Sequence, residues 1–257
     1  MKMTEYTERI KRPEDEEVIP GAQAEPTSTP ALRHTRVNDI WLGPLERPAI
    51  AWLVRRLPLW VSPDMLTGVG LFGAAMVFAG YALSGHSREF LWLASAGFAV
   101  SWFGDSLDGS LARYRRIERP LYGFFLDHAT DAIAEALVFI GLGISPFISL
   151  VPALFCLVAY LMLSVLVLVA TCSRGEFRIS YGGFGPTELR VFAVVLNVCF
   201  YTAPHPSISL PWLGQVSVYD AAAATLSAAL LGSFLVAARG HERALAKIDP
   251  RPSPRSE

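Results

Sequence analysis

Charged residues are scarce in the middle of this 257-residue chain, and their scarcity excludes several classes of protein. Positions 41–238 hold only 23 of the 45 Asp, Glu, Lys and Arg residues, about half the density of a soluble domain. The 38 positions from Ala136 to Ser173 have no charge at all. The net charge of −1 excludes a basic nucleic-acid-binding protein, and the apolar composition excludes an acidic disordered chain. A polytopic membrane protein remains, and we expect no nucleic-acid partner.

Cysteine is equally scarce. The three cysteines lie in or beside apolar runs without metal-ligand spacing, which excludes a disulfide scaffold and a cysteine metal site: Cys156, Cys172 and Cys199. We expect all three to be small buried side chains. Residues 1–40 lack the apolar segment of a secretory signal peptide and are rich in charge, Pro, Ser and Thr. They are therefore predicted to form a disordered cytoplasmic tail.

Long apolar runs, by contrast, are plentiful. Runs of 17–25 residues suit helices that cross a hydrocarbon core of about 30 Å. They lie at about 64–84, 89–112, 121–142, 149–172, 187–203 and 216–238. The sequence therefore predicts an all-α integral membrane protein, with six transmembrane helices in a domain at 41–238 and a cytoplasmic C-terminal tail at 239–257.

The segment ahead of the first run has a different character. Positions 45–57 mix apolar residues with Arg47, Arg55 and Arg56, a pattern typical of an amphipathic helix that lies in the membrane interface. In the first run itself, small residues predict close packing against a neighbouring helix: Gly68, Gly70 and Gly73.

The arginines predict the orientation of the spans. Positions 41–238 contain 11 basic residues, all arginine, and six spans place ten of them on the same side as both termini. Arg88 is the exception, and the loops 143–148 and 204–215 on the far side carry no charge. Because basic loops remain in the cytoplasm, we expect both termini on the cytoplasmic side.

Four carboxylates interrupt the second and third apolar runs near that side: Asp105, Asp108, Asp127 and Asp131. A carboxylate inside a membrane span costs roughly 2.5–3.5 kcal/mol on insertion scales, so such residues are functional candidates. On the second run the two aspartates lie about 60° apart on one helix face, and Gly109 and Ala112 share their stripe. On the third run, Gly123 and the two aspartates recur every four residues. If the stripes face each other, they form an acidic pocket in which a bulky ligand can approach the backbone.

Four carboxylates at close quarters repel one another unless protons or a cation offset their charge. A hard divalent cation that prefers oxygen ligands, Mg²⁺ or Mn²⁺, would do so. A metal held by carboxylates recruits phosphates, which indicates a phosphorylated or diphosphate substrate. Arg113, one turn beyond the stripe, could add a fork of donors for that phosphate. Phosphoryl transfer needs little beyond such a metal, positioning and a base for the attacking hydroxyl.

The two stripes together resemble the signature of the CDP-alcohol phosphotransferases, D-x2-D-G-x2-A-R followed by G-x3-D-x3-D. Residues 105–113 are Asp-Ser-Leu-Asp-Gly-Ser-Leu-Ala-Arg, and residues 123–131 are Gly-Phe-Phe-Leu-Asp-His-Ala-Thr-Asp. More loosely, residues 63–67 resemble the family's Pro-Asn-x-Leu-Thr at the start of the first span, with Asp64 in place of Asn. The nine-residue spacer from Tyr114 to Tyr122 is one residue longer than is usual in the family, and we expect the loop to absorb it.

The resemblance implies a homodimeric enzyme with six membrane helices and a site open to the cytoplasm. It implies one or two divalent ions that hold the diphosphate of a CDP-linked alcohol, such as CDP-diacylglycerol or a CDP-amino alcohol. The implied metal ligands are Asp105, Asp108, Asp127 and Asp131, and the implied nucleotide contacts are Gly109, Ala112, Arg113 and Gly123. Asp131 is also the implied general base, which accepts the proton of an acceptor alcohol while the phosphoalcohol group is transferred and CMP leaves. Such a reaction belongs to phospholipid biosynthesis.

Three residues near the signature have open roles. His128 follows the third aspartate, as in choline and ethanolamine phosphotransferases, and could either pack or polarise an acceptor. Glu135, one turn beyond Asp131, could pair with a cationic head group or with an arginine of a neighbouring helix. Arg190, beside a glycine-rich loop, could bind a phosphorylated acceptor; Ala132, where several phosphate-accepting members have a basic residue, weakens that hypothesis.

Two other functions would use membrane carboxylates. An intramembrane prenyltransferase also binds a diphosphate through Mg²⁺ and aspartates, but the Gly-x2-Ala-Arg element favours a CDP-alcohol. A cation transporter should have polar groups near the midplane of several spans, whereas the last three runs have almost none beyond Asn197 and Asp220. The CDP-alcohol hypothesis is therefore preferred over both.

Overall fold

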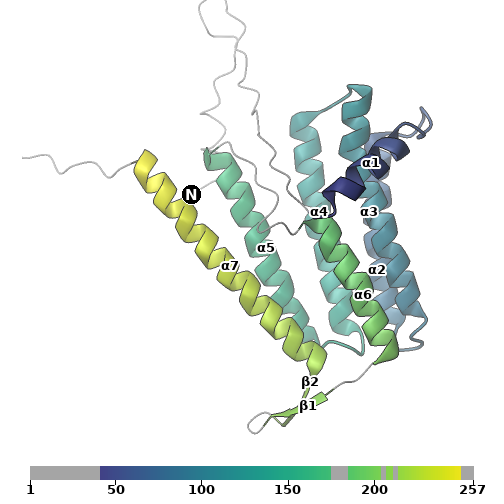
Figure 1. Ribbon diagram of the computed structural model, residues 1–257, viewed down its shortest axis with the longest axis vertical. Coiled ribbons are helices and arrows are strands. Elements are labelled where there is room, and N and C mark those ends of the chain that lie inside the picture. The colour runs from purple at the N-terminus through teal and green to yellow at the C-terminus, as the bar shows by residue number, and fades with distance from the viewer. Residues whose placement is uncertain (1–40, 175–184, 204–206, 211–213, 250–257) are drawn as a thin grey trace, which may run out of the picture. The chain divides into compact units, whose positions relative to one another are not determined.

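The computed structural model describes residues 41–174, 185–203, 207–210 and 214–249 (Figure 1). The predicted N-terminal tail lies outside these residues, as does the end of the predicted C-terminal tail. The helices are α1 (Gly43–Val54), α2 (Pro63–Leu83), α3 (Phe90–Arg115), α4 (Pro120–Ile144), α5 (Leu150–Arg174), α6 (Pro186–Thr202) and α7 (Val218–Ile248). Two short strands, β1 (Ser207–Leu210) and β2 (Gly214–Ser217), form an antiparallel hairpin between α6 and α7.

The six long helices, α2 to α7, coincide with the six apolar runs. Among the described residues, three stretches are long and apolar enough to cross a membrane: Pro63–Leu83, Leu150–Ser173 and Val218–Ile248. The acidic residues of α3 and α4 lower the hydropathy of those helices, and α6 has only 17 residues. The chain is thus mostly helical with helices suited to a membrane, and the count of six spans stays a prediction.

Glycines hold α2 against α3. A Cβ atom at Gly104 of α3 would overlap the backbone of Gly70 in α2, and one at Gly97 would lie 2.7 Å from the Val77 nitrogen. At Gly73 a Cβ would lie 2.8 Å from the Gly97 carbonyl oxygen, whereas at Gly68 it would meet open space. The predicted close packing therefore involves Gly70 and Gly73, and the backbones of α2 and α3 approach more closely than side chains would allow.

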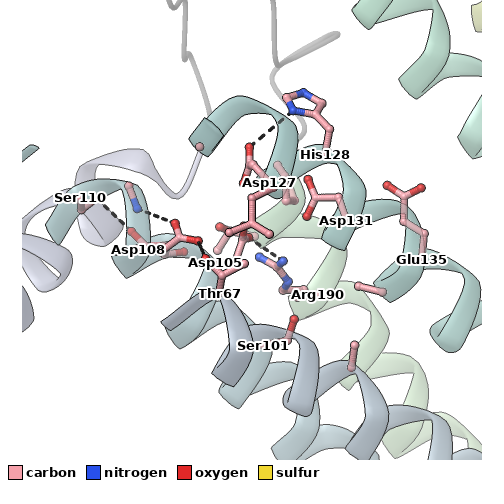
Figure 2. Close-up of a pocket in the computed structure, with 18 of the residues that line it drawn as sticks. Thr67, Ser101, Asp105, Asp108, Ser110, Asp127, His128, Asp131, Glu135 and Arg190 are labelled. Atoms are coloured by element: carbon pink, nitrogen blue, oxygen red, sulfur yellow. Dashed lines mark hydrogen bonds and ion pairs between the residues drawn. The ribbon is translucent and has the colours of Figure 1, made fainter. Parts of the chain in front are cut away.

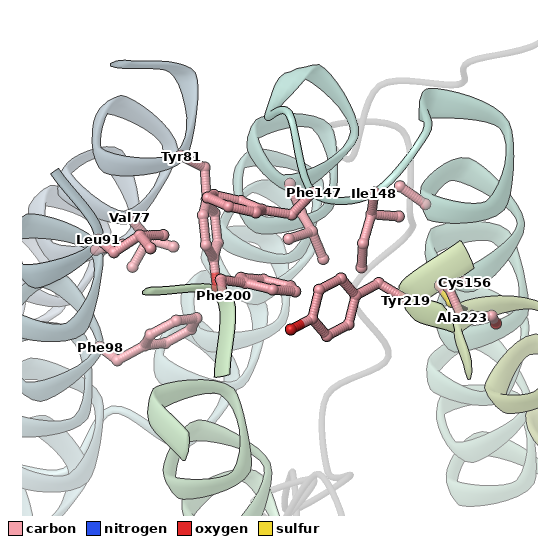
Figure 3. Close-up of a cluster of buried hydrophobic side chains, with 13 residues drawn as sticks. Val77, Tyr81, Leu91, Phe98, Phe147, Ile148, Cys156, Phe200, Tyr219 and Ala223 are labelled. Atoms are coloured by element: carbon pink, nitrogen blue, oxygen red, sulfur yellow. Dashed lines mark hydrogen bonds between the residues drawn. The ribbon is translucent and has the colours of Figure 1, made fainter. Parts of the chain in front are cut away.

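A hydrophobic core fills the end of the bundle that carries the hairpin (Figure 3). Phe200 of α6 is fully buried and stacks on Phe147 with ring centroids 4.6 Å apart, while Tyr219 of α7 meets its edge at the same distance. Buried polar groups here are paired, because the Tyr81 hydroxyl donates to the Asn197 side chain at 2.8 Å. This core joins α2 and α3 to the beginning of α7.

Arg115, the last residue of α3, anchors the segment between α1 and α2. Its guanidinium donates to the backbone carbonyls of Pro58 at 2.8 Å and of Val61. Arg116 then ends the helix in the left-handed conformation, with φ 56°. The turn into α4 therefore leaves room for the long spacer. Pro120 begins α4, which contains the second part of the signature, residues 123–131, in one continuous helix.

Three features differ from the predictions. Helix α7 continues to Ile248, because residues 239–248 contain good helix formers and no proline. The hairpin arises where Ser207–Leu210 alternates polar and apolar residues, a strand pattern too short to stand out within an apolar chain. The burial expected for all cysteines is wrong for two of them, since Cys156 is buried whereas Cys172 and Cys199 are exposed on the helix surface.

Candidate active site

Three of the four signature aspartates gather at one point between α3 and α4. Carboxylate oxygens of Asp105, Asp127 and Asp131 all lie within 4.8 Å of one another. Figure 2 shows their side chains around a common space, Asp105 from α3 and the other two from successive turns of α4. The four-residue spacing on α4 therefore places its stripe opposite α3.

Arg190 supplies a positive charge to this group. Its Nη2 atom lies 2.7 Å from an oxygen of Asp105, and the two side chains are 19% and 28% exposed. Because the pair is partly shielded from solvent, the attraction is less screened than at a surface. Arg190 lies at the beginning of the second turn of α6, so this ion pair joins α6 to the acidic end of α3.

Asp108 lies outside the group of three. One of its oxygens accepts a hydrogen bond from the Thr67 hydroxyl of α2 at 2.7 Å, and the other accepts one from the Gly109 backbone. The carboxylate is therefore held between α2 and α3, beside the cluster. Thr67 lies at the start of the first span, in the segment that resembles the family's Pro-Asn-x-Leu-Thr, and no pattern in the sequence predicts its contact with Asp108.

The two carboxylates that follow on α4 have few partners. Among the residues that the structure describes, neither Asp131 nor Glu135 receives a hydrogen bond, and one oxygen of Glu135 is completely buried. Figure 2 shows Glu135 one turn beyond Asp131 on the same helix. A buried carboxylate oxygen without a partner is costly, so Glu135 marks a place where a ligand would supply the missing contact.

The small residues of the signature leave space beside the aspartates. A Cβ at Gly123 would meet nothing within 4 Å, and one at Gly109 would lie 3.3 Å from the Arg113 guanidinium. Arg113 also donates to the Ser110 hydroxyl at 3.2 Å. These residues and Ala112 all line the cavity described below, at the end of the aspartate cluster nearer the α3–α4 turn.

His128 points away from Asp131 and Glu135 in Figure 2. Its Nδ1 atom lies 2.8 Å from the Phe124 carbonyl and 3.9 Å from an oxygen of Asp127, and its ring packs against Phe124 with centroids 4.3 Å apart. The imidazole is therefore packed along its own helix and touches the cluster only through Asp127.

Helix α1 connects α3 with α6 beside the cluster. One oxygen of Glu46 accepts hydrogen bonds from Trp102 Nε1 at 2.9 Å, from Ser106 at 3.2 Å and from Thr187 at 2.9 Å. Glu188, which is 8% exposed, accepts from the backbone nitrogens of Leu42 and Gly185 at 2.9 and 3.0 Å. The two glutamates thus fasten the beginning of α6, and with it Arg190, to α1 and α3.

Sequence reasoning missed the role of Glu46 for a physical reason. A single acidic residue in an amphipathic helix is normally read as part of the face that contacts solvent. The three groups that donate to Glu46 belong to residues 56 to 141 positions further along the chain. No local pattern connects such residues. Nor does any sequence pattern around Ser106 or Thr187 predict that their hydroxyl groups donate to Glu46.

A cavity of about 1780 Å³ contains the cluster and continues between α4, α5, α6 and α7. The part around the aspartates is polar and is bordered by α1 to α4, whereas the part beyond Glu135 is bordered by Phe139, Val167, Leu226 and Leu230. The site therefore joins a charged region to an apolar one. A substrate that combines a phosphate with lipid-like parts would suit both.

The donor set fits a hard divalent cation. Three carboxylates meet within 4.8 Å while one guanidinium faces them, so negative charge is in excess and all the donor atoms are oxygens. Oxygen-only sites of this kind suit Mg²⁺ or Mn²⁺. Asp105, Asp127 and Asp131 are the residues that would hold the ion, and Asp108 lies beside them.

Comparison with known proteins gives the chain a family. The profile of the CDP-alcohol phosphatidyltransferase family matches residues 60–235, which include both signature stripes and all six long helices except the end of α7. Helix α1 precedes the matched region.

Similar curated proteins include two cholinephosphotransferases and an archaeal enzyme. Cholinephosphotransferase 1 of Homo sapiens is 24% identical over 189 residues, which are 69% of this chain and 46% of that protein. Cholinephosphotransferase 1 of Xenopus laevis is 33% identical over 98 residues, 36% of this chain and 24% of that protein. Archaetidylinositol phosphate synthase of Methanothermobacter thermautotrophicus is 37% identical over 135 residues, which are 52% of this chain and 64% of that protein. The chain thus spans less than two thirds of each of these relatives.

A solved structure shares the fold. Phosphatidylinositol phosphate synthase of Mycobacterium tuberculosis, crystallised with CDP-DAG bound, superimposes with a TM-score of 0.50 at 22% sequence identity. The match covers 77% of this chain and 94% of that one. At this identity the likeness concerns the arrangement of the helices.

Proposed function

The chain belongs to the CDP-alcohol phosphatidyltransferase family, and from that premise we propose that it transfers a phosphoalcohol group from a CDP-linked alcohol to an acceptor hydroxyl, releasing CMP. The observation that carries this proposal is the convergence of Asp105, Asp127 and Asp131 within 4.8 Å, beside small residues that leave the backbone accessible. Such a transfer is a step in phospholipid biosynthesis. CDP-diacylglycerol and CDP-amino alcohols are the donors to be considered.

Asp105, Asp127 and Asp131 would hold Mg²⁺ or Mn²⁺, as one ion or two, with Asp108 adjacent. A bound divalent ion would supply the positive charge that a diphosphate requires in this acidic setting. The nucleotide would lie against Gly109, Ala112 and Gly123, where absent or small side chains give it room. The guanidiniums of Arg113 and Arg190, which are among the arginines that line the cavity, could face its phosphates.

The transfer itself exchanges one phosphoester bond for another. The acceptor oxygen forms a bond to the phosphorus of the transferred group, the bond from that phosphorus to the CMP oxygen breaks, and the bonding electrons leave with CMP. Asp131 accepts the hydroxyl proton on a carboxylate that would also face the ion and that receives no hydrogen bond from the described residues. Arg190 is kept near by its ion pair with Asp105 and would stabilise charge on the leaving group.

The membrane arrangement completes the proposal. Six spans with both termini and the cluster on the cytoplasmic side agree with the distribution of arginines. Helix α1 would lie in the interface on that side, with its apolar face against α2 and α3 through Val54, Leu66 and Leu107. Like other members of the family, the chain is proposed to act as a homodimer.

Release of CMP tests the proposal directly. Purified protein in lipid nanodiscs would be incubated with Mg²⁺, one donor at a time (CDP-diacylglycerol, CDP-choline or CDP-ethanolamine) and a panel of alcohols. We expect CMP to appear with at least one donor and to disappear in chelator, with activity restored by Mg²⁺ or Mn²⁺. Undiminished turnover in chelator would reject the metal-dependent mechanism.

The same assay separates the two other functions. Release of pyrophosphate from a prenyl diphosphate, without any CMP from CDP-alcohols, would favour a prenyltransferase. Uptake of a cation into liposomes without CMP release would favour a transporter. The family match over residues 60–235 supports the CDP-alcohol over both.

A further inference from the structure

Glu135 is a carboxylate that the proposed reaction does not use. It lies one turn beyond Asp131 on α4 and lines the same cavity. One of its oxygens is completely buried and receives no hydrogen bond from any residue that the structure describes. Since burying an unsatisfied carboxylate is costly, its position needs an explanation other than packing.

Two hydroxyl groups of α5 line the cavity together with Glu135. Tyr160 and Ser164 are four residues apart on α5 and therefore share one face of that helix. Neither hydroxyl has a hydrogen-bond partner within the described parts of the chain. Glu135 and Asp131 are near enough to act electrostatically on the Tyr160 hydroxyl. An acceptor and two potential donors with unused bonding capacity thus line one cavity, on the neighbouring helices α4 and α5.

The place of this group along the cavity indicates which substrate it would contact. Successive residues of the α4 stripe are about 6 Å apart, so Glu135 lies on the far side of the aspartates from Gly123. In an in-line displacement the attacking and leaving oxygens occupy opposite sides of the phosphorus. If CMP leaves toward Gly109 and Gly123, the acceptor alcohol must approach from the side of Glu135.

The chemistry of the group disfavours one kind of acceptor. Glu135 and Asp131 both present carboxyl oxygens to the cavity, and the nearby Arg190 is paired with Asp105. A phosphate placed here would face carboxylates, whereas a hydroxyl or an ammonium group would donate to them. The apolar walls formed by Phe139 and Val167 further favour a group with no negative charge.

We propose, on the basis of the function proposed above, that Glu135, Tyr160 and Ser164 form the acceptor subsite and select an alcohol that carries no phosphate. The acceptor would donate a hydrogen bond from a hydroxyl or ammonium group to Glu135 and receive one from Tyr160. This chemistry is shared by a lipid alcohol that enters from the apolar part of the cavity and by a small alcohol from the cytoplasm. The test distinguishes these two sources.

Acceptor selectivity provides the test. CMP release would be measured in nanodiscs at saturating donor while the acceptor is varied over diacylglycerol, inositol and glycerol, with inositol phosphate and glycerol phosphate as the phosphorylated counterparts. We expect the wild-type protein to use an unphosphorylated acceptor with kcat/KM at least about tenfold above that of a phosphorylated one. The better of diacylglycerol and the small alcohols identifies the source.

Variants then examine the residues themselves. We expect Glu135→Gln and Tyr160→Phe each to raise KM for the acceptor about tenfold, as the loss of a hydrogen bond to a charged group predicts, with KM for the donor changed less than about twofold. Glu89→Gln is the matched control, because Glu89 precedes the other end of α3 and accepts a hydrogen bond from the Tyr201 hydroxyl at 2.8 Å, far from the cluster. Should Glu135→Gln fail to fold, Tyr160→Phe alone carries the test.

The outcomes separate this inference from the proposed function. A preference of the wild type for phosphorylated acceptors, or an unchanged acceptor KM in both cavity variants, would overturn the subsite while leaving CDP-alcohol transfer intact. Absence of CMP release from every donor in the wild type would overturn the transfer reaction and the subsite together. A rise of acceptor and donor KM alike would show a general disturbance of the cavity and also reject the subsite.

Discussion

Helices α2, α3 and α4 meet through glycine, whereas α5 and α7 meet through side chains. Backbones touch at Gly70, Gly97 and Gly104, and a Cβ at Gly141 of α4 would lie 2.9 Å from Phe78 of α2. Between α5 and α7 side chains make the contact, as where the Cys156 thiol donates to the Ala223 carbonyl at 3.2 Å. Within the protein, 39% of the apolar stretch of α2 is buried, against 22% for α5 and 11% for α7.

The two groups of helices also contribute different residues to the cavity. All four signature aspartates belong to α3 and α4, and Asp105 lies directly on the glycine contact, where a Cβ at Gly70 would be 3.3 Å from its backbone nitrogen. The apolar end of the cavity is instead bordered by α5 and α7. We therefore expect the part packed through glycine to position the reactive groups and the other part to surround the substrate, so the first should tolerate change far less than the second.

The largest effect is expected at Asp131 in the part packed through glycine. Asp131→Asn removes the proposed base and should lower kcat by roughly 10²–10⁴-fold while donor binding persists. CMP release and donor-induced thermal shifts would be measured side by side. Asp220→Asn is the control, because Asp220 bonds Ser149 at the other end of the bundle. Turnover close to that of the wild type would reject the base assignment.

A single methyl group tests the glycine contact. Gly104→Ala places a Cβ within the Gly70 backbone and should destabilise the protein by about 1–3 kcal/mol, with loss of activity as the aspartates shift. Gly232→Ala on α7 is the same change in open space and should be neutral or stabilise by up to about 1 kcal/mol. Thermal unfolding in detergent would compare them. Equal midpoints for the two variants would contradict the proposed difference between the parts.

Glu46 tests how α6 is attached to the part packed through glycine. Glu46→Ala leaves the donors on Trp102, Ser106 and Thr187 without their acceptor and should cost about 1–3 kcal/mol. Because Arg190 follows Thr187 by one turn, activity should also fall. Glu242→Ala, at an exposed position of α7, should change stability by less than about 0.5 kcal/mol. If Glu46→Ala behaves like this control, α1 does not hold α6 in place.

The smallest effect is expected in the α5–α7 contact. Cys156→Ala removes a buried thiol and its weak hydrogen bond and should destabilise by about 1 kcal/mol or less, with activity retained. Cys172→Ala, at an exposed thiol, should have no measurable effect. A loss in Cys156→Ala as large as that in Gly104→Ala would show that both parts are equally intolerant.

Local patterns predicted the features that local physics determines. Apolar runs of sufficient length located α2 to α7, and the four-residue spacing on α4 placed Asp127 and Asp131 on one face opposite Asp105. The contact of Asp108 with Thr67 and that of Arg190 with Asp105 join residues 41 and 85 positions apart. Neither pairing has a periodic signal, so Arg190 could be named as a candidate but not assigned its partner.

Burial was less predictable than helix position. In a membrane protein an apolar side chain can face lipid as well as the core, so the sequence could not tell the buried Cys156 from the exposed Cys172 and Cys199. The same ambiguity concerned Glu135, whose neighbours on α5 became visible only once α4 and α5 were placed side by side. The family comparison names the reaction class, and only the arrangement of the helices shows which polar groups lack partners.

The hairpin between α6 and α7 offers a position at which the transmembrane topology can be tested. It lies at the end of the bundle opposite α1 in Figure 1 and presents Ser207 and Ile208 at the surface. If six spans are correct, an epitope inserted between Leu210 and Gly214 lies on the opposite side of the membrane from one at the C-terminus, and protease protection in sealed vesicles of known orientation would compare the two. Because the insertion is remote from the aspartates, topology and catalysis can be read on the same active molecule.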